Sequence, residues 1–313
     1  MTPARTVFIG SGGFGVQALG VLAASPDVRI VGIVTAPPRP AGRQQELQPT
    51  PIAAAAAALG LAPVLEPDRL REPTSITQVL DLGPQLVVLA DYGRIVPAPL
   101  LEVPLGALNL HPSLLPRHRG ATPVPATILA GDSETGVSII RMDEGIDTGP
   151  IVAVAREPLF GHETTPELES RLAAVAARLL GATVGPWVRG ELEARPQDPT
   201  LATHTRPLTR EDGRLDPDRP AVDLERAVRA HLPWPGSFIQ TGLMGRLIVR
   251  SATVGPSATI DAPGHLVADD DGLALTTVDG RLRLGQVQLE GRRSMDATTL
   301  RRGAPGLVGT AVA

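Results

Sequence analysis

The residues of this chain that are best suited to hydrogen-bonding and acid–base chemistry lie in two short segments. The first contains Asn109 and His111, two positions apart at the end of an apolar run, and the second contains Asp147. Because alternate side chains of a β-strand point to the same face, Asn109 and His111 are expected to face one cleft. A carboxamide, an imidazole and a carboxylate together can stabilise a developing negative charge and move a proton.

Each of these residues also has a purely structural interpretation. A histidine near a strand end is often a satisfied structural residue, and an aspartate bounded by glycines, as in Gly145-Ile146-Asp147-Thr148-Gly149, often forms a turn. Residue types alone leave both interpretations open for His111 and Asp147. His118 is assigned to packing or solvent. The other histidines have no partners spaced like metal ligands and are assigned to structure or surface: His162, His204, His231 and His265.

The composition excludes several other chemistries. All 29 basic residues are arginine, which removes lysine Schiff bases and the lysine of phosphate-binding loops. Cysteine is absent, which removes thiol nucleophiles, disulfides and thiolate metal sites. A net charge of -4 and an aromatic set of four Phe, two Trp and one Tyr do not favour a protein that stacks single-stranded bases on rings. Any contact with RNA must therefore be local.

A glycine-rich turn from Gly10 to Gly15 has the spacing of a dinucleotide-binding loop. It follows an apolar run and precedes a predicted helix. Such a site also needs an acid at the end of the second strand, where this chain has Val34-Thr35-Ala36-Pro37. Arg39 keeps a dinucleotide with a 2′-phosphate as an alternative, but a tight strand-to-helix turn of small residues is the favoured interpretation.

The elements that must position the polar residues alternate between strand and helix up to about residue 190. Short apolar runs rich in β-branched residues predict buried parallel strands, and Thr-Pro pairs predict helix starts for 51–59 and 166–188. The predicted strands are 6–9, 28–35, 86–90 and 107–110. This pattern predicts an α/β domain over residues 1–193, with a mostly parallel sheet and a ligand beyond the carboxyl ends of its strands.

A stretch with three prolines and no periodicity, residues 194–207, is predicted to be a linker. The second domain then covers residues 208–313. Turn residues between short apolar runs predict a small β-barrel there. One helix is predicted at 223–230, and short strands are predicted near 238–240, 246–254, 273–278 and 281–289.

The sequence predicts neither a membrane span nor an export signal. The longest apolar run, residues 52–65, is mostly alanine and is too short to cross a bilayer. Residues 16–24 only faintly resemble a signal peptide, because glycines stand where its apolar helix should begin. Without disulfides to indicate an oxidising compartment, we expect a cytoplasmic protein with no membrane partner. We also expect a monomer, although nothing in the sequence establishes the oligomeric state.

The polar motifs of this chain resemble those of a known family. Asn109-Leu110-His111, Ser113–Pro116, Arg119-Gly120 and Asp147-Thr148-Gly149 resemble the active-site signature of the folate-dependent formyltransferases. Within that family the resemblance extends over nearly the full chain to the members that act on charged initiator tRNA. Further motifs match in order: Arg39–Arg43, Tyr92-Gly93, Gly131–Gly136 and Trp234-Pro235-Gly236. The resemblance implies a Rossmann-like formyl-transfer domain followed by an OB-like β-barrel.

The resemblance also implies substrates and residue roles. The donor would be 10-formyltetrahydrofolate, the acceptor would be the α-amino group of methionyl-initiator tRNA, and no metal is required. Asn109 and His111, the latter if protonated, would stabilise a tetrahedral intermediate, and Asp147 would assist proton transfer. The pterin would bind largely through backbone groups, and the Ser113–Pro116 turn would also shape the acceptor side. The folate-binding positions would be Leu89, Ala90, Asp91, Tyr92, Gly93, Ser113, Leu114, Leu115, Pro116 and Ile146.

Arg39 and Arg43 are the residues that the resemblance assigns to the acceptor stem of tRNA. The family usually carries further basic residues after Arg43, but this chain has Gln44, Gln45 and Glu46. We therefore expect only weak electrostatic attraction between this loop and the tRNA phosphates. Two alternatives stay open. A relative that formylates an amino sugar on a nucleotide would share the three polar residues, although the arginine loop and the barrel argue against it. A folate-binding or RNA-binding module without catalysis would be favoured only if those residues were scattered.

Overall fold

The computed structural model describes residues 2–41, 46–242, 244–255, 262–270 and 272–312. The chain divides into two compact units. The first contains residues 1–123, 134–158 and 169–206, and the second contains residues 124–133, 159–168 and 207–313. Two short stretches that precede residue 169 therefore belong to the second unit.

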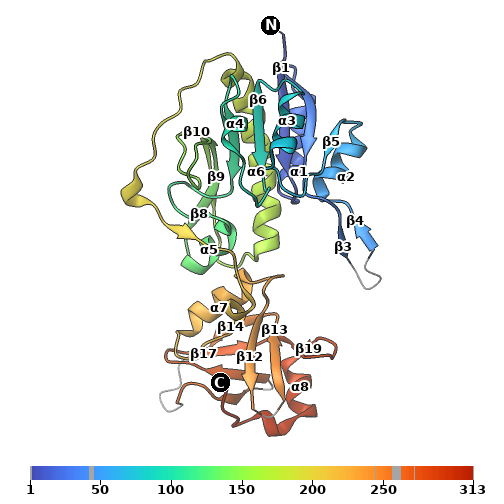
Figure 1. The fold of residues 1–313 in the computed structure, drawn as a ribbon. Helices are drawn as coiled ribbons and strands as arrows, with labels where there is room; N and C mark the ends of the chain where they lie inside the picture. Colours follow the sequence, from blue (N-terminus) through green and yellow to red (C-terminus); the bar gives the residue numbers. More distant parts are fainter. Residues whose placement is uncertain (1, 42–45, 243, 256–261, 271, 313) are drawn as a thin grey trace. The chain divides into compact units, whose positions relative to one another are not determined.

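The first unit is built on a seven-stranded sheet with the order β10-β9-β7-β6-β1-β2-β5 (Figure 1). The five neighbouring strands β7, β6, β1, β2 and β5 pair in parallel. Strand β9 pairs antiparallel with both β7 and β10. The sheet is therefore mostly parallel, as predicted. Its strands are β1 (Ala4–Gly10), β2 (Val28–Val34), β5 (Val64–Leu65), β6 (Leu86–Ala90), β7 (Ala107–His111), β9 (Glu134–Arg141) and β10 (Ile151–Pro158).

The centre of this sheet is shielded from solvent, because β6 and β7 are buried along their whole length. Helix α2 begins as the sequence predicts, with Pro51 in its first turn and the Thr50 hydroxyl accepting a hydrogen bond from the Ala53 N–H. The helices of the N-terminal half are α1 (Gly15–Ala24), α2 (Pro51–Ala58), α3 (Pro73–Leu80), α4 (Ala98–Leu101), α5 (Pro123–Ala130) and α6 (Thr165–Val188).

Two short strand pairs complete the first unit. A hairpin is formed by β3 (Arg39–Ala41) and β4 (Glu46–Gln48). The second pair joins β8 (Arg119–Gly120) in parallel to β11 (His204–Thr205). Because β11 lies within the stretch 194–207, that stretch packs on the first unit as well as connecting it to the second. A 3-10 helix, η1 (Pro199–Leu201), lies in the same stretch.

The second unit contains two four-stranded antiparallel sheets around a core of apolar side chains. The predicted strand 246–254 divides into β13 (Gly245–Val249) and β14 (Ala252–Gly255), which lie in different sheets. The predicted strand 281–289 divides likewise into β17 (Arg281–Leu284) and β18 (Gln286–Leu289). Long strands that bend from one sheet into the other are how small barrels turn their corners.

The remaining elements of this unit follow the same order as the chain. The predicted helix at 223–230 is found as α7 (Ala221–Ala230). The others are η2 (Arg210–Gly213), β12 (Ser237–Thr241), β15 (Leu266–Asp269), β16 (Gly272–Thr276), β19 (Met295–Asp296), α8 (Ala297–Gly303) and η3 (Pro305–Leu307). Over the described ranges, no helix combines the length and the apolar character that a bilayer crossing requires.

Candidate active site

The carboxyl ends of β1, β6 and β7 meet where the order of the sheet reverses. From β1 the chain proceeds to β2 on one side, and from β6 it proceeds to β7 on the other. In open α/β sheets this reversal is the usual place for a ligand. Asn109 and His111 stand at the end of β7, and both are buried.

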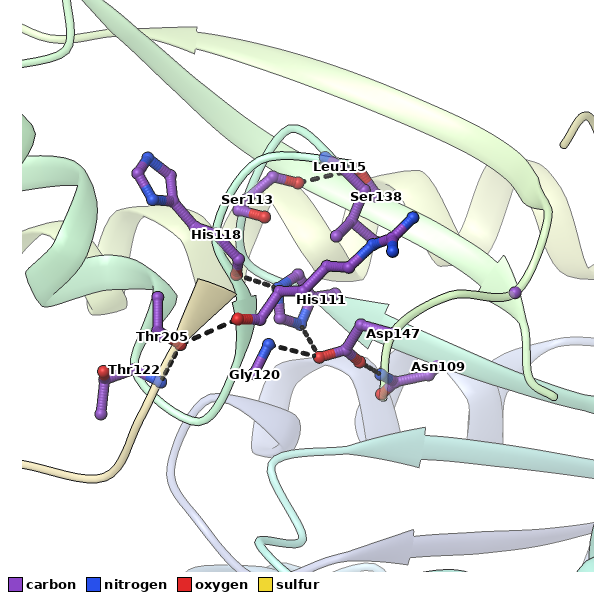
Figure 2. Close-up of polar contacts among 12 residues, drawn as sticks. Asn109, His111, Ser113, Leu115, His118, Gly120, Thr122, Ser138, Asp147 and Thr205 are labelled. Atoms are coloured by element: carbon purple, nitrogen blue, oxygen red, sulfur yellow. Dashed lines mark hydrogen bonds and ion pairs between the residues drawn. The ribbon is translucent and has the colours of Figure 1, made fainter. Parts of the chain in front are cut away.

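Asp147 brings the three predicted polar residues together (Figure 2). Its Oδ1 accepts a hydrogen bond from Asn109 Nδ2 at 3.2 Å, and its Oδ2 accepts one from the Gly120 N–H at 2.8 Å. The same Oδ2 lies 3.6 Å from His111 Nδ1. The sequence expectation that these side chains share one site is confirmed as geometry. The condition that would have favoured a module without catalysis, a scattered trio, is not met.

The protonation of His111 follows from its two neighbours. Nε2 lies 2.9 Å from the carbonyl oxygen of His118, and because a carbonyl only accepts, Nε2 carries a proton. Burial lowers the pKa of His111, although Asp147 and the His118 carbonyl favour the charged ring. Burial therefore favours the neutral ring, in which the lone pair of Nδ1 faces Asp147. A protonated His111, as expected from the resemblance, carries a cost of burial that the sequence does not show.

Hydrogen bonds from Ser138, a residue of β9, hold the turn that supplies the His118 carbonyl. Ser138 Oγ donates to the Ser113 carbonyl at 2.8 Å and accepts from the Leu115 N–H at 3.1 Å. Ser113 Oγ in turn donates to the Arg117 carbonyl at 2.7 Å. The ring of His118 is buried and points away from the trio in Figure 2, so its backbone is what reaches His111.

The positions predicted to bind folate differ in how exposed their side chains are. Leu89 and Ala90 are buried at the end of β6, and the Ser113–Pro116 turn lies beside β9 as described above. Ile146 is 72% exposed next to Asp147. Tyr92 is different, because its side chain packs in an apolar cluster with Leu70 and Val96, and burial raises its pKa. Only the backbone of Tyr92 is therefore suited to contact a ligand.

Asp91 explains the glycine-rich turn. Its carbonyl accepts hydrogen bonds from the N–H groups of Ser11 and Gly12 at 2.9 and 3.1 Å. A Cβ on Gly12 would lie 1.6 Å from Asp91 Oδ2, so any other residue there must displace this carboxylate. The Phe14 N–H hydrogen-bonds the carboxylate, although burial dominates and raises the pKa of Asp91. An acid thus lies where α1 begins and where a dinucleotide would place its phosphates, which favours the tight-turn interpretation.

The predicted RNA-binding residues are described only in part. Arg39 is exposed at the start of the β3–β4 hairpin. Arg43 lies outside the described residues, as do Gln44 and Gln45. Within the described ranges, His, Cys, Asp and Glu side chains form no group of three or more that could hold a metal ion.

Gln197, which the sequence did not predict as a site residue, hydrogen-bonds the backbone of the segment that carries Asp147. Gln197 Nε2 donates to the carbonyl oxygens of Asp147 and Gly149 at 2.8 and 2.7 Å. Its Oε1 accepts from Nε and Nη2 of Arg119 at 3.1 and 2.8 Å. A glutamine in an aperiodic, proline-containing stretch carries no sequence signal that could have placed it here.

Comparison with known proteins identifies the family. The formyl transferase family matches residues 4–184, and the family of formyl transferase C-terminal domains matches residues 207–305. A methionyl-tRNA formyltransferase of Chloroflexus aggregans is 44% identical over 296 residues, covering 93% of this chain and 94% of that protein. One from Gluconacetobacter diazotrophicus is 43% identical, covering 98% of each chain. The chain belongs to the methionyl-tRNA formyltransferase family.

The resemblance drawn from the motifs is thereby confirmed, and the chain is an enzyme of the methionyl-tRNA formyltransferase family. Its fold is shared with more distant formyltransferases. An N-formyltransferase from Helicobacter canadensis, solved with folinic acid and dTDP-3-aminofucose, has a TM-score of 0.64 at 14% identity, covering 91% of this chain and all of that chain. Glycinamide ribonucleotide transformylase 1 from Symbiobacterium toebii has a TM-score of 0.52 at 23% identity, covering 63% of this chain and 95% of that chain.

Proposed function

We propose that this protein transfers the formyl group of 10-formyltetrahydrofolate to the α-amino group of methionyl-initiator tRNA. The observation that carries the proposal is the convergence of Asn109, His111 and Asp147 at the carboxyl edge of the sheet, in a chain of the methionyl-tRNA formyltransferase family. The reaction belongs to the cytoplasm, where we place the protein, and requires no second copy of the chain.

Asn109 supports the charge that develops on the formyl oxygen. When the amine nitrogen bonds to the formyl carbon, the carbonyl electron pair moves to oxygen and a tetrahedral oxyanion forms. A carboxamide has two N–H donors, and Asn109 gives one of them to Asp147. The second N–H is available to the oxyanion, and the bond to Asp147 fixes the amide in the orientation that this requires.

His111 is suited to move the proton. In the neutral ring Nε2–H is held by the His118 carbonyl, so Nδ1 is the nitrogen that accepts a proton from the attacking amine. The ring then becomes an imidazolium whose charge Asp147 stabilises and whose Nδ1–H also faces the oxyanion. As the bond between the formyl carbon and the folate nitrogen breaks, that proton passes to the departing nitrogen. The products are tetrahydrofolate and a formylated amine.

The residues around the trio fit a folate. A pterin is flat and needs an apolar surface with backbone hydrogen-bonding groups beside it. Ile146 precedes Asp147 and Ile95 follows the end of β6, and these apolar side chains are 72% and 77% exposed. The exposed Gly93 lies just beyond the same strand end. We assign the folate to this surface and the acceptor stem to Arg39 and Arg43.

One assay tests the proposal against its alternative. The enzyme is given 10-formyltetrahydrofolate with charged initiator tRNA, charged elongator tRNA or an amino-sugar nucleotide in parallel reactions. The expected result is fast formylation of the initiator tRNA and little or none of the other acceptors. Formylation of the amino sugar in preference to the charged tRNA would overturn the proposal.

A further inference from the structure

Residues 195–206, here called the strap, lie against the segments that surround the Asp147 carboxylate. Arg195 and Ile151 exchange two backbone hydrogen bonds of 2.7 and 2.8 Å. The Thr203 carbonyl accepts from the Arg119 N–H at 2.9 Å, and its hydroxyl accepts from the His118 N–H at 2.8 Å. The strap is therefore bound both to the strand that follows Asp147 and to the turn that carries Gly120.

Gln197 is the strap residue that joins these two segments through its side chain. The guanidinium of Arg119 can only donate, and the carbonyls of Asp147 and Gly149 can only accept. The orientation of the Gln197 carboxamide is therefore fixed, with Oε1 on Arg119 and Nε2 on the two carbonyls. Arg119 is 6% exposed and Gln197 is half-buried, so water competes only in part with these hydrogen bonds.

The backbone of Asp147 needs this support. Its φ is 54°, in the left-handed region that non-glycine residues keep only where the surroundings hold them there. Two of the contacts around it converge on the same pair of segments: Gln197 binds the Asp147 carbonyl, and the Gly120 N–H binds the Asp147 carboxylate. Gly120 follows Arg119 directly, so Gln197 links the segment that carries the carboxylate to the segment that carries one of its donors.

We propose that Gln197 is a positioning residue for formyl transfer. It holds the Asp147 carboxylate against Asn109 and His111 by tying the backbone at 147–149 to Arg119. This inference rests on the proposed function, because it takes Asp147 as a participant in proton transfer. It assigns a role in catalysis to a stretch that the sequence suggests is only a connection.

The first test is Gln197→Met, which keeps the length of the side chain and removes all four hydrogen bonds. The matched control is Gln288→Met, because Gln288 also accepts from an arginine, Arg250, and donates through Nε2 to a backbone carbonyl, that of Arg292 at 2.7 Å. We expect kcat to fall about 10- to 100-fold in Gln197→Met, as for other small misplacements of reacting groups, and to stay unchanged in the control. Equal kcat values in both folded variants would overturn the proposal.

A second variant and a double-mutant cycle separate positioning from general support of the fold. Gln197→Glu keeps an acceptor for Arg119 but removes the N–H donors, so it should fold and still lose kcat; normal kcat in this variant refutes the role of those donors. In an Asp147→Ala background, Gln197→Met should reduce the residual rate by less than about threefold, because its effect passes through Asp147. A full additional loss there would show that Gln197 acts elsewhere.

A measurement without substrates keeps this inference distinct from the proposed function. The charged and titratable groups that act on His111 are Asp147, which favours the imidazolium, and His118, which opposes it. If Gln197 holds the Asp147 carboxylate in place, Gln197→Met must lower the pKa of His111 in an NMR titration of the ligand-free protein. An unchanged titration refutes the positioning role even if formyl transfer is confirmed. A lowered pKa supports it even if charged tRNA proves not to be the acceptor.

Discussion

Replacing Asp147 by Asn should abolish most of the activity, because the site requires an acceptor on both oxygens. The carboxylate receives the Asn109 amide on Oδ1 and the Gly120 N–H on Oδ2, and it faces Nδ1 of His111 from 3.6 Å. Asparagine has one oxygen and one donating NH₂ group. In one orientation the new NH₂ group meets the Gly120 N–H; in the other it meets the Asn109 amide, which must turn over to present its oxygen and so loses its orientation toward the oxyanion. In both orientations the negative charge that would stabilise a protonated His111 is lost.

The expected size follows from these contacts. Removing one preorganised donor or charge from a site where an oxyanion develops costs about 2.7–4 kcal/mol, which is about 10²–10³ in kcat. Leaving a buried N–H without its acceptor costs about 1–3 kcal/mol of folding free energy, and the Asp147 side chain is only 14% exposed. Asp147→Asn should therefore be a folded protein of reduced stability with a much larger loss of turnover.

The assay compares kcat for formylation of charged initiator tRNA with the affinity for folinic acid measured by calorimetry. Folate affinity should change much less than kcat, because the pterin is expected to bind through backbone groups. A folded Asp147→Asn protein that turns over within threefold of wild type would refute the reasoning, and so would a loss of folate binding that matches the loss of kcat.

Three further predictions concern stability and RNA binding. Burial lowers the pKa of His111, so the unfolded chain takes up a proton at higher pH than the folded chain does. In urea unfolding, the free energy of unfolding should therefore fall as the pH drops through about 6.5, and it should fall less steeply in His111→Gln than in wild type. Gly12→Ala places a Cβ 1.6 Å from the Asp91 carboxylate and should cost about 1–3 kcal/mol in thermal unfolding, most of it recovered by adding Asp91→Ala. Arg39→Ala and Arg43→Ala should each raise KM for charged tRNA several-fold and reduce its salt dependence by about one phosphate contact, leaving folate affinity intact; kinetics at several salt concentrations that match wild type would exclude this loop as the RNA contact.

The sequence predicts the first-unit elements whose patterns are local. The runs that became β1, β2, β6 and β7 are mostly apolar, and most of their residues are buried. Thr50 is recognisable from its residue type as the N-cap of α2. Strand β10 gave no such signal, because its side chains are intermediate or exposed along its length. In the second unit, the bends that divide the two long runs into β13, β14, β17 and β18 depend on how two sheets meet, which no local pattern encodes.

The site, too, contains residues that the sequence predicts and features that it does not. Asn109 and His111 follow from strand alternation, and Asp147 follows from the motif resemblance, so their meeting could be expected from the sequence. The contribution of Gln197 could not, because it depends on a contact between residues 50 positions apart in the chain. The lowered pKa of His111 could not either, since it results from burial that outweighs the neighbouring carboxylate.

In the proposed mechanism Asn109, His111 and Asp147 together transfer a formyl group to the amine of a charged tRNA. The most direct measurement is a single turnover with 10-formyltetrahydrofolate carrying an isotopic label in its formyl group, followed on charged initiator tRNA for wild type and for Asn109→Ala. The account predicts that the label appears on the α-amino group of methionine, and that Asn109→Ala slows this step about 10²- to 10³-fold, as for the loss of an oxyanion donor. Label that does not reach the amine with wild type, or that reaches it equally fast with Asn109→Ala, would contradict the account.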